Sequence, residues 1–501
     1  MKLTFSLVAL SVSVALAAER PVDDVAAVRY DSGEVMAKMM AKKEATWNRF
    51  RGLGFFKHGR YRTTNTYSAC SNGYVSLKTK SYAEKFACKN LDVTGHLVHG
   101  DLGSTDDSGE VGSSLWGYTV DGREFVAIGQ TDGTAFAEVV GKGWWNYVPF
   151  IGKAEGTLDY IGRLPQYSTP SLWREIRDYK GRYAIIGSEA NDHGVQIFDI
   201  RKLLEVRPSW NPLSTKTKVF DINTDASHFA DLPRGRSHNV VSAEASNHII
   251  AVGAQPRTDA CRGGLIFIDV SDINNPKRTG CAADDGYVHD AQCLIYHGPD
   301  KKYEGTEICY GYNEDSLTIY NITDKTTTNI ISRTSYDGVS YTHQGWVLDT
   351  NNQAFLLMDD EYDEVDRLGA AADQRATTLI WNITSLENPI LSGTYKSDVI
   401  SVDHNQYVKN MFSYQANYGA GVRILDVSSI PTDPTGAGVS EVAFIDIFPE
   451  DDDITSEPDF MGTWHTYPFF KSGHVVLNTF DRGVFAVKRS RKLTGRVRAE
   501  F

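Results

Sequence analysis

Four histidines recur along the chain in similar surroundings. They stand in the strings SHNVVS, VHDAQC, THQGWV and DHNQYV, as His238, His289, His343 and His404. Successive members are 51, 54 and 61 residues apart. Imidazoles that converge beside a carboxylate such as Asp290 can bind a transition metal or a ligand, or act as acid and base. The recurrence also fits a structural role, in which each histidine hydrogen-bonds to a neighbouring repeat.

The densest group of carboxylates follows an apolar run. Five acidic residues fall within six positions: Asp359, Asp360, Glu361, Asp363 and Glu364. Oxygen ligands suit Ca²⁺, so the sequence offers a candidate metal site at Asp359, Asp360, Glu361 and Asp363. The spacing is not that of an EF-hand, and an acidic loop surrounded by solvent explains the same residues.

Several kinds of chemistry lack any motif in this sequence. It contains no GxSxG elbow, no P-loop, no HExxH and no GxGxxG after a strand. Paired carboxylates could serve glycoside hydrolysis, but a sequence does not give their separation. The net charge of −13 excludes a general attraction to nucleic acid or anionic lipid.

A repeated strand must position these residues. Its form is Gly-x-x-apolar-apolar-Asp-apolar, as in GVQIFDI, GLIFIDV and GVRILDV. Variant and weaker copies bring the total to seven, with sixth positions at Glu138, Asp199, Asp269, Asn321, Asn382, Asp426 and Lys488. An earlier strand of each repeat carries a histidine or a tryptophan, and two further apolar runs complete four short strands per repeat.

Seven such sheets bury their apolar faces only against one another. We therefore predict an all-β fold, a seven-bladed β-propeller over residues 69–489 with a short N-terminal extension. Inner strands line the channel of a propeller, so the four histidines should meet at one mouth, beneath the acidic loop. The last repeat lacks a fourth strand, and residues 91–103 resemble an outer strand that could complete it.

Both ends of the chain lie outside the predicted ring. Residues 1–17 read as a signal peptide, which predicts a secreted, extracellular protein. No other apolar run is long enough to span a bilayer, so we expect no transmembrane segment in the mature chain. Residues 18–68 form a leader or helical extension, with a pro-segment and a spacer as open alternatives. Residues 490–501 form a basic tail.

The six cysteines and two sequons agree with secretion. An even cysteine count in a secreted chain indicates disulfides. Neighbouring strands predict bridges Cys293–Cys309 and Cys261–Cys281, which leaves Cys70 to pair with Cys88. Asn321 and Asn382 lie in Asn-x-Thr sequons and are candidate glycosylation sites of a glycoprotein. Alternatively, asparagine simply replaces aspartate in the turn.

Several longer strings resemble one family. SLWREI, YVHDAQCLIYHGPD, EGTEICYGYNED, LLMDDEYDE, YQANYGAGVRILDVS and GTWHTYPFF look like the extracellular choice-of-anchor B proteins, which are LVIVD-repeat β-propellers. The resemblance runs from Cys70 to Lys488 and implies a propeller outside the cell, without an established reaction. The chain departs from the family pattern at His465 and in its tail, which carries no recognisable anchor.

Two functions fit these observations. The first is a secreted or cell-surface binding module for an extracellular protein, glycan or surface ligand. The second is a secreted metal-assisted hydrolase or lyase, with a divalent cation, Ca²⁺ or a transition metal, at the channel mouth. The missing nucleophile motifs favour the binding module, and whether the chain is an enzyme stays open at this point.

Overall fold

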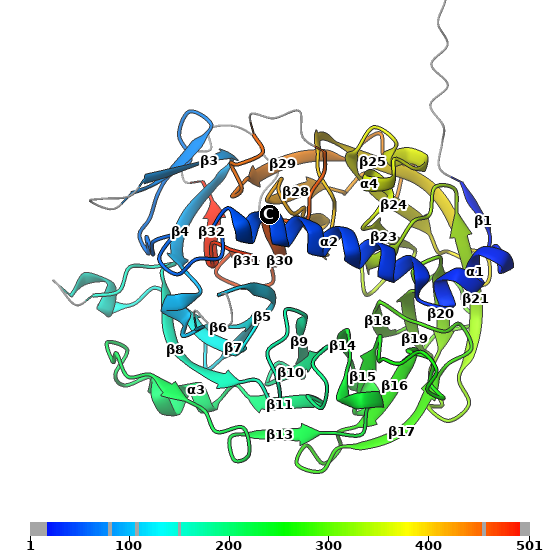
Figure 1. Cartoon of the computed structure of the whole chain (residues 1–501), viewed down its shortest axis with the longest axis horizontal. Helices are drawn as coiled ribbons and strands as arrows, with labels where there is room; N and C mark the ends of the chain where they lie inside the picture. Colours follow the sequence, from blue (N-terminus) through cyan, green and yellow to red (C-terminus); the bar gives the residue numbers. More distant parts are fainter. Residues whose placement is uncertain (1–17, 79–82, 106–109, 149–151, 453–456, 491–501) are drawn as a thin grey trace, which may run out of the picture.

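Seven four-stranded antiparallel sheets stand around a central channel in a computed structural model of the chain (Figure 1). The structure describes residues 18–78, 83–105, 110–148, 152–452 and 457–490. The predicted signal peptide and all but the first residue of the basic tail lie outside these ranges. The seven-bladed β-propeller predicted from the sequence is confirmed. Among the described residues, no helix is both long and apolar enough to cross a membrane.

The innermost strands contact one another around the whole ring. They are β5 (Gly112–Val120), β9 (Arg174–Tyr179), β14 (Asn239–Ala243), β18 (Asp290–Ile295), β22 (Thr342–Val347), β26 (Gln406–Lys409) and β30 (Thr463–Tyr467). The second strands are β6 (Arg123–Gln130), β10 (Tyr183–Ser188), β15 (His248–Val252), β19 (Glu307–Tyr312), β23 (Phe355–Asp360), β27 (Phe412–Ala416) and β31 (His474–Thr479).

The third strands carry the repeated motif. They are β7 (Gly133–Val139), β11 (Val195–Asp199), β16 (Leu265–Asp269), β20 (Leu317–Asn321), β24 (Arg375–Asn382), β28 (Val422–Asp426) and β32 (Val484–Arg489). The outer strands are β8 (Leu158–Pro165), β13 (Ala226–Phe229), β17 (Lys277–Ala282), β21 (Asn329–Tyr336), β25 (Ile390–Ile400), β29 (Ser440–Ile445) and, from the other end of the chain, β4 (Leu91–Leu97).

Further elements border the sheets. Short strands β1 (Glu19–Pro21) and β12 (Lys218–Val219) pair with β21 and β8, and the hairpin β2 (Tyr74–Lys78) and β3 (Ala83–Lys89) extends the blade of β29. The helices are α1 (Asp24–Asp31), α2 (Glu34–Gly52), α3 (Lys202–Val206) and α4 (Asp363–Asp366). Short 3-10 turns are η1 (Gly100–Leu102), η3 (Trp144–Tyr147), η4 (Pro233–Gly235), η5 (Glu244–Ser246) and η6 (Gly369–Ala371).

The sixth position of the motif closes a turn. The carboxylate of Asp269 accepts a hydrogen bond from the backbone N–H of Ser271 at 2.8 Å. Asn321 and Asn382 accept in the same way, each at 3.0 Å, from the residue two positions on. Aspartate and asparagine both offer this acceptor, so the turn accounts for their exchange between repeats.

The ring closes where the two ends of the chain meet. Strand β4 pairs antiparallel with β32, with Leu97 opposite Val484 and His96 opposite Phe485. This strand lies within the range 91–103 expected to complete the last blade. His96 is buried, stacks on Phe485 and donates from Nε2 to the carbonyl oxygen of Arg482 at 2.8 Å.

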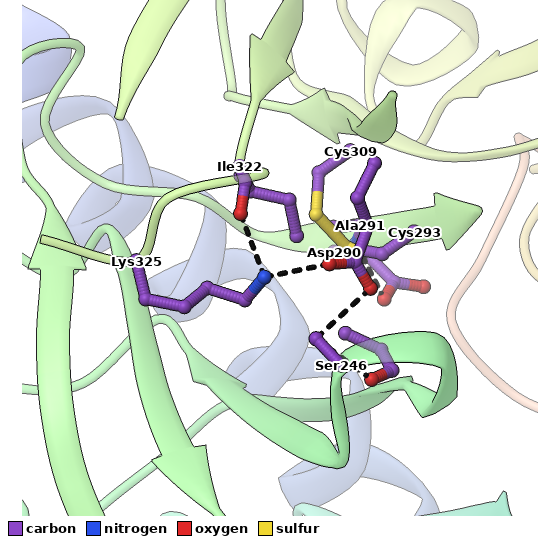
Figure 2. Close-up of a disulfide and its surroundings, with 9 residues drawn as sticks. Ser246, Asp290, Ala291, Cys293, Cys309, Ile322 and Lys325 are labelled. Carbon is purple, nitrogen blue, oxygen red and sulfur yellow. Dashed lines mark hydrogen bonds and ion pairs between the residues drawn. A yellow bond between two sulfur atoms is a disulfide. The ribbon is translucent and has the colours of Figure 1, made fainter. Parts of the chain in front are cut away.

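Three disulfides join the cysteines as predicted: Cys70–Cys88, Cys261–Cys281 and Cys293–Cys309. Cys293 and Cys309 lie directly opposite each other on β18 and β19, the arrangement expected for a hairpin (Figure 2). Beside them, Lys325 donates to the Ile322 carbonyl oxygen at 2.6 Å. Lys325 also donates to Glu307 of β19 at 2.6 Å. The disulfide thus joins β18 to β19, and the lysine joins β19 to the loop after β20.

Protonation of His96 should weaken the closed ring. Burial lowers the pKa of His96 to about 4, against an ordinary 6.5. As the pH falls, the unfolded chain therefore takes up this proton at a higher pH than the folded chain does. The free energy of unfolding decreases between pH 6.5 and pH 4. At 1.36 kcal/mol per pKa unit, the free energy of unfolding should fall by about 3 kcal/mol relative to His96→Gln. Urea unfolding of both proteins at pH 7 and pH 4 measures this; a constant difference would contradict it.

Removal of the cross-strand disulfide should destabilise the fourth blade. Replacing Cys293 and Cys309 together by alanine lengthens the free chain of the unfolded state and should lower the free energy of unfolding by roughly 2–4 kcal/mol. Guanidinium unfolding measures the loss. The matched change of Cys70 and Cys88, which lie in the edge hairpin, serves for comparison. An unchanged midpoint in the first variant would show that the blade does not depend on its bridge.

Candidate functional site

The four recurring histidines meet at one mouth of the channel. Their rings form a row, with centroids 4.2 Å apart for His238 and His289, 4.4 Å for His289 and His343, and 4.4 Å for His343 and His404. All four are buried and line a cavity of about 20 Å³ together with Trp464 and other residues. A cavity of this size holds about one water molecule.

Hydrogen bonds fix the protonated nitrogen of two of these rings. His289 Nδ1 lies 2.8 Å from the carbonyl oxygen of His343, and His404 Nδ1 lies 2.7 Å from that of Trp464. A carbonyl oxygen only accepts, so each Nδ1 carries the proton. In the neutral ring, Nε2 is therefore an unprotonated acceptor.

The other two histidines are held by carboxylates. His238 Nδ1 lies 2.5 Å from Glu189 Oε1, and His343 Nδ1 lies 2.8 Å from Asp359 Oδ1. That same Asp359 oxygen accepts from the backbone N–H of Gln344 at 3.1 Å. His343 Nδ1 is thus a donor as well, and its Nε2 is left with a lone pair.

Burial keeps the imidazoles of His289, His343 and His404 neutral. It lowers the pKa of His289 and His343 well below the ordinary 6.5, and the pKa of His404 to about 4. The cause is the low polarity of the site, because charging an imidazole there is costly. Neutral imidazole is also the form that binds a metal ion.

Glu361 is the carboxylate on which two of the lone pairs converge. Its Oε1 lies 3.5 Å from His404 Nε2, and its Oε2 lies 3.9 Å from His343 Nε2. Tyr418 donates to Oε1 at 2.5 Å, while the fully buried Oε2 has no hydrogen-bond partner. One donor atom from each of His343, Glu361 and His404 lies within 4.8 Å of the other two, so these three side chains could hold a metal ion.

The acidic segment is not a solvated loop, as one interpretation of the sequence had it. Asp359, Asp360, Glu361 and Glu364 are fully buried, and Asp363 is nearly so. The expected four-carboxylate metal site does not form either, because the donor atoms of these residues do not gather around one point among the described residues. These side chains make different contacts instead.

Asp360 organises the backbone of the mouth. Its oxygens accept from the N–H groups of Ser340 and Tyr341, both at 2.7 Å. Asp363 and Glu364 lie in α4, and burial raises the pKa of both carboxyls well above the usual range. Protonated carboxyls can be buried side by side at a much lower cost than carboxylates.

Asp290, which we grouped with the histidines, lies in a second polar cluster inside the channel. Arg177 donates to Asp290 at 3.1 Å, to the Tyr407 hydroxyl at 2.6 Å and to His465 Nε2 at 3.1 Å. Trp116 contacts Tyr407 here, so the first repeat does not place its tryptophan at the mouth. Asp290 is therefore part of a satisfied ion pair rather than of the histidine row.

Sequence analysis missed the residue that completes the mouth. Lys43 of helix α2 is 3% exposed, and its ammonium group lies 2.6 Å from Glu361 Oε1. The buried residues of α2 are Met39, Lys43, Trp47 and Phe50, which form one helical stripe. A lysine in the middle of an apolar stripe was the available sign that this helix docks on something acidic.

Comparisons with known proteins give no family for this chain and only distant structural neighbours. No family model and no curated protein matches the chain. Among solved structures, the β-propeller domain of Myceliophteria thermophila Cps50 (Swd1) is 10% identical, with a TM-score of 0.41, over 73% of this chain and 93% of that one. The computationally designed Ika8 protein is 11% identical, with a TM-score of 0.40, over 86% and 97%.

His289 should behave as a structural member of the row. Changing His289 to alanine removes the N–H group that donates to the buried carbonyl oxygen of His343. It also leaves a gap between the rings of His238 and His343. The expected cost is roughly 1–3 kcal/mol of unfolding free energy. Thermal unfolding with and without added Zn²⁺ checks this, since the loss should be the same in both. A loss that zinc reverses would instead make His289 a metal ligand.

Proposed function

We propose that this chain is an extracellular binding module whose channel mouth holds a divalent transition metal ion through His343, Glu361 and His404. One observation carries the proposal: two imidazole lone pairs and an unpartnered carboxylate oxygen converge in a buried space. Lone pairs repel one another unless a cation lies between them. Two imidazoles and one carboxylate suit Zn²⁺ and its neighbours in the first transition row.

The distances fit such an ion. Zinc bonds to nitrogen and oxygen are about 2.0–2.2 Å long, so two tetrahedral ligands lie about 3.4 Å apart. The separations between Glu361 and the two Nε2 atoms, 3.5 and 3.9 Å, are close to this value. Small side-chain movements would bring all three donors to bonding distance.

The outer contacts also resemble those of metal-binding histidines. A histidine ligand usually gives its other N–H to a carboxylate or a carbonyl oxygen, which orients the ring. His343 does so with Asp359 and His404 with the Trp464 carbonyl oxygen. With three protein ligands, the ion would keep a coordination position for a group of the partner, such as a carboxylate.

An extracellular location rests on several supporting points. Three disulfides are typical of proteins from oxidising compartments. The apolar start of the chain reads as a signal peptide, and the family resemblance points to the cell exterior. We infer a protein, glycan or surface component as partner, and glycosylation at Asn321 and Asn382.

A second candidate function, metal-assisted hydrolysis or lyase chemistry, is favoured by Glu175. This residue lines the same cavity as the histidines, and burial raises its pKa to about 7. A carboxyl that titrates near neutrality can act as general acid or base. Glu175→Gln should then abolish turnover of an ester or glycoside by the zinc-loaded protein without changing zinc binding. If neither protein turns over the substrate, the enzymatic candidate fails and the binding module stays the proposed function.

Loss of the two histidine ligands should abolish metal binding. Protein stripped with a chelator and titrated with Zn²⁺ by calorimetry should bind one ion per chain. The double variant His343→Ala, His404→Ala should bind at least 100-fold more weakly, because two of three ligands are gone. His297→Ala, at a half-exposed surface histidine, is the matched control and should bind as the wild type does. Equal binding by all three proteins would disprove the site.

A further inference from the structure

A cation of the chain itself already lies against one of the proposed metal ligands, Glu361. Lys43 donates to Glu361 Oε1 at 2.6 Å, and its ammonium group lies 5.2 Å from the centre of the Phe460 ring. Glu361 is fully buried, so removing this lysine would leave an uncompensated negative charge. The Lys43 ammonium and the Tyr418 hydroxyl are the donors to Glu361 within the described part of the chain.

Helix α2 brings Lys43 to this point by lying across the ring (Figure 1). Trp47, one turn further on, donates from Nε1 to the Phe460 carbonyl oxygen at 3.0 Å and contacts Trp173 and Phe480. Phe50 contacts Phe448 with ring centroids 5.6 Å apart. The apolar stripe of the helix thus packs on a cluster of aromatic side chains at this end of the channel.

The helix is attached to the blades by side chains alone. Strand pairing holds the segment before it, where β1 pairs with β21, but α2 itself adds no strand to any sheet. At its edges, Lys42 pairs with Asp366 at 3.1 Å and Thr46 donates to Asp459 at 2.6 Å, both at least partly exposed to solvent. This is how an amphipathic helix binds a groove, and such an element can leave without unfolding the sheets.

We infer that Lys43 occupies the position of the metal ion, so that docking of α2 and binding of a divalent cation at the mouth exclude each other. The inference rests on the proposed function, because the ligands are the same. Two cations on one carboxylate repel strongly in a buried site of low polarity. The cavity of about 20 Å³ that the histidine row lines holds about one water molecule, which is too little for a metal ion together with a ligand group.

The channel mouth is therefore a site with two alternative occupants. With α2 docked, the lysine neutralises Glu361, and the histidine row lines a cavity that holds about one water molecule. With α2 displaced, the three donors and the row of imidazoles are open to a metal ion and to a partner group on the outside. Residues 34–52 thus act as a ligand supplied by the chain itself, and metal binding becomes linked to their release.

The test compares zinc binding of full-length wild type and Lys43→Met by calorimetry. Methionine keeps the apolar stem of the side chain and removes the charge that competes with the ion. We expect the variant to bind Zn²⁺ at least 10-fold more tightly. Lys301→Met is the matched control, because this lysine lies on the fourth blade, is 77% exposed and pairs with Glu304; it should bind as the wild type does.

Hydrogen exchange of the wild type provides a second readout that does not depend on the variant folding well. Addition of saturating Zn²⁺ should accelerate exchange of the amides of 34–52 at least 10-fold, while those of β23 stay protected. If wild type and Lys43→Met bind zinc equally tightly, and the amides of α2 stay protected from exchange when zinc is bound, the competition is disproved. The proposed metal site would not be affected by that result. Absence of zinc binding in both proteins would overturn the proposed function and this inference together.

Discussion

The pairing of β4 with β32 is the constraint on which the rest of the molecule depends. Each blade has two apolar faces, and each face is covered only if the neighbouring blade is present. A chain of six complete blades and one incomplete blade would leave an open sheet edge and two uncovered faces. The strand from the N-terminal side supplies the missing edge, and Leu97 lies opposite Val484 across the closure.

This closure also determines where the preceding residues go. Because β4 belongs to the last blade, the segment that precedes it must end on the ring. Strand β1 holds one end on the fourth blade, and β4 holds the other on the seventh. The path between these two blades leads across the channel, and α2 lies on that path (Figure 1). The helix over the mouth is thus a consequence of how the ring closes.

The two polar clusters of the channel differ in how their charges are satisfied. Inside, Arg177 forms ion pairs with Glu175 and Asp290 and hydrogen-bonds to Tyr407, so each carboxylate has a cation beside it that belongs to the sheets. At the mouth, Glu361 Oε2 has no donor, although it is fully buried. Burial alone would raise the pKa of Glu361, but the Lys43 ammonium beside it holds that pKa below its usual range. The charge balance of the mouth therefore depends on a helix outside the sheets.

Sequence patterns were sufficient for the fold and for part of the site. Strand periodicity and turn residues are local, so seven copies of one motif predicted seven blades. Neighbouring strands predicted two disulfides, and the third followed because two cysteines remained. The recurrence of His238, His289, His343 and His404 placed them on one mouth, because equivalent positions of a ring share one end. That Asn321 replaces aspartate in a turn was also visible in the repeat.

What only the tertiary structure decided is the state of each charged group. Asp359 to Glu364 look in sequence like a loop in solvent, but the ring and α2 bury them completely or almost so. The partner of Glu361 is 318 residues away in the chain, and no periodicity links Lys43 to it. Local spacing determines which strands form and which residues share a face. The pairing of buried charges depends on contacts between distant segments, and these exist only once the ring has closed.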